Sequence, residues 1–327
     1  MPVPEVENMR ADDQKIVVYG PFSYGLFGVV KQLQEFVPPL VNEIFGEAYS
    51  KKTQVTLCNT FRAIGTRFSS RDRRAPDIVV NLKDQSGNTE EKTYILDCVT
   101  RFSQDVLDLV AEHIVSVACE NVEMRDDVVA LRYPNAAVMV LMPEGDIPRH
   151  IRVTLREADG QDMSYLVPVI RLDRYTLNDI FEKGLMILLP FYLYNFASEF
   201  EEMEADQTRR EALEDAVLEI VDRLEQMVTS DELRSCHWLS VADQLYMVNM
   251  SWLLHYNHLD RTVGQIIRGA YIRASSFRAA EELGRWKVMA LMKYLLKNGK
   301  VETALEATED SNYAEELLKK LEKGEPI

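Results

Sequence analysis

Two aspartates beside apolar runs are the residues of this chain whose types and spacing most clearly suggest chemistry. Asp77 follows a proline and opens the run 78–82 (Ile-Val-Val-Asn-Leu), and Asp97 ends the run 94–97 (Tyr-Ile-Leu-Asp). The polar segment 84–91 between them contains a Ser-Gly-Asn turn, which predicts two adjacent strands. Carboxylates on neighbouring strands can bind a hard divalent cation through oxygen. The alternative is that both are strand-end residues bonded to nearby backbone.

Several elements are expected to position these aspartates. A helix is predicted from Ser103, a suitable N-cap, with a buried stripe formed by Leu107, Val110, Ile114 and Val117. The other predicted elements are helical segments over 24–45 interrupted at Pro38-Pro39, strands over 53–61 and 136–142, a hairpin of 150–156 with 165–172, and a helix over 177–189 ended by Pro190.

The pattern changes character near residue 197. Beyond it, apolar residues recur at helical spacing, as in Leu213, Val217, Ile220 and Leu224, and no strand pattern follows. We therefore expect a disordered tail over 1–14, a mixed α/β domain over 15–196 and an all-helical region over 197–327. Internal repeats are not evident.

Charge is distributed unevenly along the chain. The formal net charge of −16 argues against a protein covered by nucleic acid, because phosphate binding requires lysines and arginines. Residues 51–74, however, hold seven basic side chains and one acid, directly before the first aspartate strand. This block makes Arg67, Arg71, Arg73 and Arg74 candidates for binding a nucleic-acid backbone, the alternative being a solvated charged loop.

The second half is also segmented by charge. Residues 196–238 hold thirteen acids and four arginines, and residues 261–300 hold nine basic residues and two acids. The acidic stretch is most simply the solvated face of an amphipathic helix, and it could also bind a basic protein partner.

Composition also bears on location. No apolar run is long enough for an ordinary membrane span, and residues 1–13 lack the apolar core of a signal peptide. The four cysteines are far apart within apolar patterns, as expected of reduced thiols. We therefore expect a cytoplasmic protein without a membrane segment; the sequence leaves its oligomeric state open.

The order of helix, strand, Pro-Asp strand, Asp-x-Val strand, helix and strand resembles the PD-(D/E)XK nuclease superfamily. More narrowly, the chain resembles the recombination-promoting nuclease (Rpn) and putative-transposase family. The resemblance covers about residues 24–196 and is carried further by 45–47 (Phe-Gly-Glu), 133–138 (Tyr-Pro-Asn-Ala-Ala-Val), 165–169 (Tyr-Leu-Val-Pro-Val), 175–185 (Tyr-Thr-Leu-Asn-Asp-Ile-Phe-Glu-Lys-Gly-Leu) and 188–192 (Leu-Leu-Pro-Phe-Tyr).

The resemblance implies a restriction-endonuclease-like mixed sheet flanked by helices and Mg²⁺-assisted cleavage of DNA. By position, Asp77 and Asp97 would be both the catalytic and the metal-binding carboxylates. Val99 stands where the family has lysine or glutamine, and valine can neither donate a hydrogen bond nor carry charge. Lys92 and Arg101 are the nearest candidates to replace that residue.

Two further departures concern acidic groups. Asp97 stands where glutamate is more common, which shortens the reach to a metal, and no acid lies between residues 14 and 34, where the superfamily commonly has one. On the helix after Asp97, Leu109 and His113 could face the site, although Leu109 fits the core better.

Three functions follow as hypotheses. The first is a Mg²⁺-dependent DNA endonuclease using Asp77 and Asp97. The second is a catalytically inactive relative that binds DNA or a protein through the retained fold, because the motif is degenerate at Val99. The third is an interaction protein that uses its acidic helical region.

Overall fold

The computed structural model describes residues 22–58, 76–84, 90–156 and 162–298, and in the C-terminal part residues 300, 303, 306–307 and 311–323. Contacts divide the chain into two compact units, Met1–Ser198 and Glu199–Ile327. Among the described residues, no helix combines the length and apolar character needed to span a bilayer.

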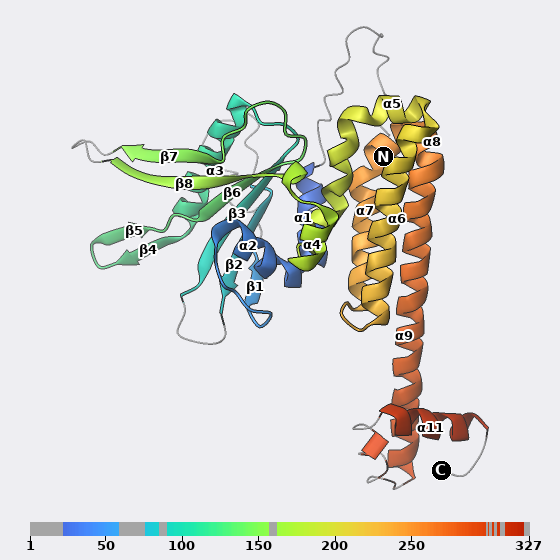
Figure 1. Cartoon of the computed structure of the whole chain (residues 1–327). Helices are drawn as coiled ribbons and strands as arrows, with labels where there is room; N and C mark the ends of the chain where they lie inside the picture. The colour runs from blue at the N-terminus through green and yellow to red at the C-terminus, as the bar shows by residue number, and fades with distance from the viewer. Residues whose placement is uncertain are drawn as a thin grey trace, which may run out of the picture. The chain divides into compact units, whose positions relative to one another are not determined.

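The first unit is a mixed α/β structure (Figure 1). Its strands are β1 (Gln54–Leu57), β2 (Ile78–Lys83), β3 (Lys92–Val99), β4 (Val122–Arg125), β5 (Val128–Leu131), β6 (Asn135–Val140), β7 (His150–Arg156) and β8 (Asp162–Arg171). Its helices are α1 (Phe22–Gln32), η1 (Gln34–Phe36), α2 (Val37–Phe45), α3 (Gln104–Glu120), η3 (Leu172–Arg174), α4 (Leu177–Glu182) and η4 (Met186–Glu199), the last of which crosses the boundary between the units.

Within the described part of the chain, six strands form one sheet in the order β1-β2-β3-β6-β8-β7. The β1–β2, β2–β3 and β7–β8 pairs are antiparallel, whereas β3–β6 and β6–β8 are parallel. The parallel β3–β6 pair requires a crossover connection, which contains α3. The coarse prediction of a mixed sheet flanked by helices is therefore confirmed.

Helix α3 covers one face of the central strands. Side chains alternate along a strand, so Val79 of β2 and Ile95 and Val99 of β3 share this face. They form one core with the apolar stripe of α3, whose buried members include Val110 and Ile114. The stripe predicted from sequence is the one that packs, although Ser103 precedes the helix without a capping bond from its side chain.

Two predicted helix boundaries are corrected. The prolines Pro38 and Pro39 do not end a helix but lie in the first turn of α2, where the missing N–H costs no intrahelical bond. The predicted helix over 177–189 is confirmed at its start, where Thr176 and Asp179 form a capping box. It ends near Gly184, whose φ of 68° suits a C-terminal turn, and Pro190 lies within the following 3-10 helix.

The small sheet β4–β5 was not predicted. Two four-residue strands are joined at Asp126 and Asp127, and Asp126 takes a positive φ of 53°. The predicted hairpin of β7 and β8 is confirmed, but its predicted turn at 158–160 lies outside the described residues.

The second unit is helical in its described residues. Its elements are α5 (Phe200–Ala205), α6 (Gln207–Thr229), α7 (Ser235–His255), α8 (Asn257–Leu259), a π-helical turn (Asp260–Gly264), α9 (Gln265–Lys297) and α11 (Ser311–Glu322). Helices α6, α7 and α9 pack together, with Trp238 fully buried among them.

Glu204 ties α5 to the start of α8. Its carboxylate accepts hydrogen bonds from the backbone N–H groups of His258 and Leu259, at 2.9 to 3.1 Å, and lies 3.0 Å from His258 Nδ1. Burial opposes ionisation, but the N–H donors outweigh it and the pKa of Glu204 is lowered from its ordinary value of 4.5.

A carboxyl group whose pKa is lowered by folding stabilises the folded chain at pH values above its ordinary pKa. This contribution to the free energy of unfolding is lost as the pH falls through the pKa of the folded state. We expect Glu204→Gln to unfold at lower urea concentration than the native chain at neutral pH, and the difference to shrink at acidic pH. Urea unfolding at both pH values, with the exposed Glu201→Gln as control, measures this. Equal pH dependence in both variants would show that Glu204 contributes no such stability.

Candidate functional site

Asp77 and Asp97 meet at the end of the β2–β3 pair. Ile78 is paired with Leu96, so the next step of the antiparallel register places Asp77 opposite Asp97. Directly opposed residues share a face, and this face is the one covered by α3. The prediction that the two aspartate strands are neighbours is confirmed. The metal-binding and catalytic roles of the two residues remain predictions.

Each carboxylate accepts a hydrogen bond from the other strand. The Asp77 backbone N–H donates to Asp97 Oδ1 at 3.1 Å, and the Cys98 backbone N–H donates to Asp77 Oδ2 at 2.7 Å. These reciprocal bonds clasp the ends of the two strands. They are the contacts expected when aspartates satisfy strand-end backbone groups.

His113 of α3 takes the second oxygen of Asp97. Its Nδ1 lies 2.9 Å from Asp97 Oδ2, and the two side chains are only 2% and 3% exposed. A histidine ring nitrogen and a carboxylate oxygen at this distance share one hydrogen bond. Asp97, His113 and the backbone of Asp77 therefore form a buried polar network between the sheet and α3.

Cys98 is buried on the opposite face of β3. Burial, together with the negative charges of Asp77 and Asp97, raises the pKa of its thiol well above the ordinary value. The thiol is therefore neutral at physiological pH and unsuited to act as a nucleophile.

Val99, which the resemblance aligns with the motif lysine, packs against the core between the sheet and α3. Each of the two candidate replacement cations forms an ion pair with a glutamate and not with the aspartates. Lys92 Nζ lies 2.7 Å from Glu47 Oε1, and Arg101 Nη1 lies 3.0 Å from Glu144 Oε2. The side chain that reaches Asp97 is instead His113, which the sequence marked only as one of two positions on its helix.

Glu47, part of the resemblance, also has a place in the structure. Its Oε1 accepts a hydrogen bond from the Tyr94 hydroxyl at 3.1 Å, and the hydroxyls of Tyr94 and Tyr49 lie 2.9 Å apart. Tyr94 is on β3 at an even position, so it faces away from Asp97. Glu47 therefore braces the other face of the sheet.

The fit of Mg²⁺ to these residues is poor. Mg²⁺ takes oxygen ligands in octahedral geometry, commonly from one or two carboxylates and water. Both oxygens of Asp97 already accept hydrogen bonds inside the protein. In the described part of the chain, no group of three or more His, Cys, Asp or Glu side chains is arranged to hold a metal ion. These bonds do not favour Mg²⁺ at the two aspartates in the arrangement that the structure shows, and a magnesium role for them stays a prediction.

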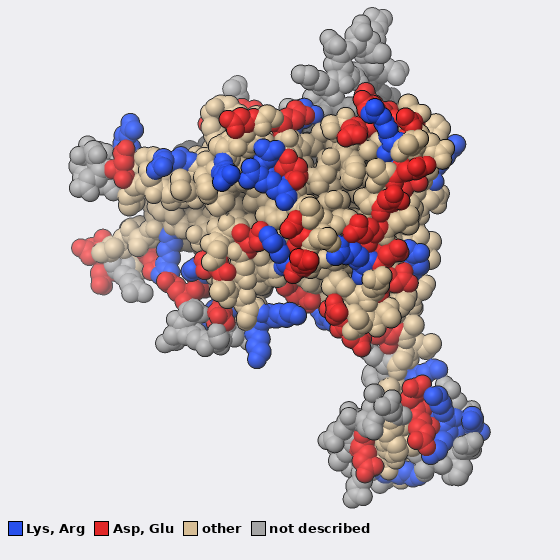
Figure 2. Space-filling view, viewed as in Figure 1, with Lys and Arg blue, Asp and Glu red and all other residues tan. Residues whose placement is uncertain are grey.

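The predicted nucleic-acid residues Arg67, Arg71, Arg73 and Arg74 lie outside the described residues. Two other members of the basic block, Lys51 and Lys52, are exposed before β1. In Figure 2, other basic side chains lie along the β7–β8 hairpin of the same unit.

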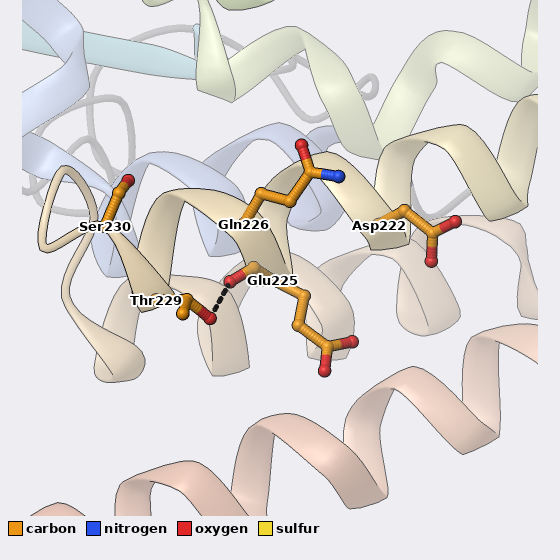
Figure 3. A pocket seen from close by; sticks show the side chains of 5 residues that line it. All are labelled: Asp222, Glu225, Gln226, Thr229 and Ser230. Atoms are coloured by element: carbon orange, nitrogen blue, oxygen red, sulfur yellow. Dashed lines mark hydrogen bonds between the residues drawn. The ribbon is translucent and has the colours of Figure 1, made fainter.

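The acidic stretch of the second unit lies on α5 and α6. Figure 3 shows a hollow at the C-terminal end of α6, lined by Asp222, Glu225, Gln226, Thr229 and Ser230. The Thr229 hydroxyl donates to the Glu225 carbonyl at 2.8 Å, which is a bond within the last turn of the helix. These contacts describe a helix end and do not define a site.

Comparison with protein-family models, curated proteins and solved structures finds no match to this chain. The class of this protein is described by its fold and its site. It has a mixed α/β unit, in which two aspartates on neighbouring strands accept hydrogen bonds from each other's strands, followed by a helical unit. The family resemblance rests on the residues quoted from the sequence alone.

Proposed function

We propose that this chain is a PD-(D/E)XK-like protein of the Rpn and putative-transposase type that binds DNA without cutting it. The order of helices and strands around Asp77 and Asp97 supports the restriction-endonuclease-like part of the proposal. The observation that carries it is the state of Asp97, whose two oxygens are bonded to the Asp77 backbone and to His113. In this proposal the two carboxylates serve to join the ends of β2 and β3 to each other and to α3.

The packing of Val99 supports the loss of cleavage. A lysine at this position would carry charge toward the aspartates, whereas Val99 adds apolar surface to the core under α3. DNA binding is supported by the basic block 51–74, which precedes the Asp77 strand directly in sequence. Arginines there would bind the phosphate backbone, without requiring a metal.

Binding to a labelled DNA duplex, followed by fluorescence anisotropy, tests the proposal. We expect affinity that falls with salt and is unchanged by EDTA. Arg73→Glu with Arg74→Glu should weaken binding by about tenfold, since two phosphate contacts are lost. The matched control reverses the charge of two exposed lysines of α9, by changing Lys293 and Lys297 to glutamate. Absence of binding, or equal loss in both double variants, would contradict the proposed DNA site.

A second function, a Mg²⁺-dependent DNA endonuclease, is favoured by one observation. Asp77 and Asp97 are directly opposed on one sheet face at the end of their strands. Plasmid nicking by the purified chain in Mg²⁺ or Mn²⁺, abolished by Asp97→Ala, would establish this function in place of the first. An intact plasmid at high protein concentration would exclude it.

A further inference from the structure

Exposed apolar side chains of the first unit concentrate on two hairpins. Among its described residues, eight large apolar side chains are exposed, and all except Val115 lie on or beside the β4–β5 and β7–β8 hairpins. They are Met124, Val128, Val129, Leu131, Tyr133, Met163 and Leu166. A concentration of this kind is typical of an interaction surface, whereas single exposed apolar residues are ordinary.

Both hairpins are two-stranded arms. Among the described strands, β4 pairs with β5 alone in the small sheet. Strand β8 pairs with β6 only over 169–171, so its residues 162–168 are paired with β7 alone. Figure 1 shows the arms projecting in the same direction from one end of the sheet. Isolated two-stranded ribbons are marginally stable in water, which favours a partner surface for the β4–β5 arm. The β7–β8 arm is partly held by the core, in which Ile151 and Val167 are buried.

The β4–β5 arm has an apolar face. Paired residues share a face, so the pairs Val122–Leu131 and Met124–Val129 place four apolar side chains on one side. Met124 is 79% exposed and Val129 is 64% exposed. No charged residue belongs to this face, so it suits an apolar partner surface.

The two arms carry opposite charges at exposed positions. Asp126 and Asp127 form the exposed turn at the tip of the β4–β5 arm. Arg149 and Arg152 are exposed near the root of the β7–β8 arm. Figure 2 shows acidic side chains at the end of the first arm and basic side chains along the second. When two copies meet about a two-fold axis, acidic tips can lie on basic roots twice.

We propose that the two arms form an isologous dimer interface with a second copy of this chain. The apolar side chains of the arms supply the centre, and the tip aspartates pair with the root arginines of the other copy. A two-fold arrangement covers the apolar surface of both copies at once, which is the commonest symmetry of homo-oligomers. The inference is independent of DNA binding.

Sedimentation equilibrium of the full chain tests the interface. We expect a dimer for the native chain, and a monomer for Val129→Glu, because a charge at the centre of an apolar interface is costly. The matched control is Val115→Glu: Val115 is 46% exposed on α3, away from the arms, and its variant should remain a dimer. A monomeric native chain, or equal dissociation of both variants, would overturn the proposal.

A charge exchange tests the same interface without changing an apolar residue. Asp126→Arg with Asp127→Arg, and separately Arg149→Asp with Arg152→Asp, should each give monomers, since like charges then meet. An equimolar mixture of the two double variants should form a heterodimer, because both contacts regain opposite charges. Failure of the mixture to associate would contradict the proposed pairing even if Val129→Glu is poorly folded.

Discussion

Replacing Asp97 by alanine is expected to lower the free energy of unfolding by about 3 kcal/mol, because the change removes one partner from a buried polar network. The Asp77 backbone N–H and the His113 ring would both lose their acceptor. The His113 side chain is only 2% exposed, so water cannot readily replace the lost bond. Urea unfolding at neutral pH, with the transition followed by circular dichroism, measures the change.

Two further variants make this result specific. Asp97→Asn keeps one carbonyl oxygen as an acceptor and should lose less stability than alanine. Asp108→Ala removes an exposed carboxylate from α3 and should change stability by less than about 0.5 kcal/mol. If Asp97→Ala were as stable as the native chain, the structural role would be contradicted. Carboxylates held together for catalysis often cost stability, so unchanged or higher stability would favour the endonuclease.

The sequence was sufficient to predict that the two aspartates lie on neighbouring strands, because the strand and turn patterns near them in the chain match the pairing of β2 with β3. Each aspartate borders a short apolar run, and a polar turn between two such runs favours a hairpin. The helix after Asp97 was also predictable, since the spacing of Val110, Ile114 and Val117 gives one apolar stripe. These features depend on residues close together in the chain.

The partner of Asp97 was harder to predict. His113 lies sixteen positions away on another element, and the α3 stripe contains apolar neighbours that equally suit the core. Only the crossing of α3 over the sheet decides which residue reaches the carboxylate. The engagement of Lys92 by Glu47 is a similar case, because these residues are 45 positions apart. Long-range pairs of this kind leave no periodic signal.

The β4–β5 arm left a weak signal that alternation could have detected. Val122 and Met124 alternate with charged residues, and Asp126-Asp127 is a plausible tight turn. Four-residue strands are short, however, and the second strand is uniformly apolar. The end of α4 at Gly184 was also hard to predict from sequence. Gly184 ends the helix in a left-handed conformation, which a glycine permits but does not require.

A lysine placed at position 99, where the resemblance has lysine or glutamine, tests whether the fold supports cleavage. We expect Val99→Lys to lower the free energy of unfolding by about 2 kcal/mol, because it places an ammonium group beside the apolar core under α3. It should not produce divalent-dependent nicking, since both oxygens of Asp97 remain bonded to the Asp77 backbone and His113. Urea unfolding and plasmid nicking measure the two expectations.

Val99→Met separates bulk from charge in this experiment. Methionine is also long and unbranched but carries no charge, so it should be tolerated better than lysine. Nicking by Val99→Lys alone, sensitive to EDTA, would show that the aspartates can leave their framework bonds once a cation is supplied. In that case the valine at position 99 would be the feature that prevents cleavage at this site. Loss of stability without nicking in Val99→Lys instead places the obstacle in the Asp97–His113 network, which a single lysine cannot undo.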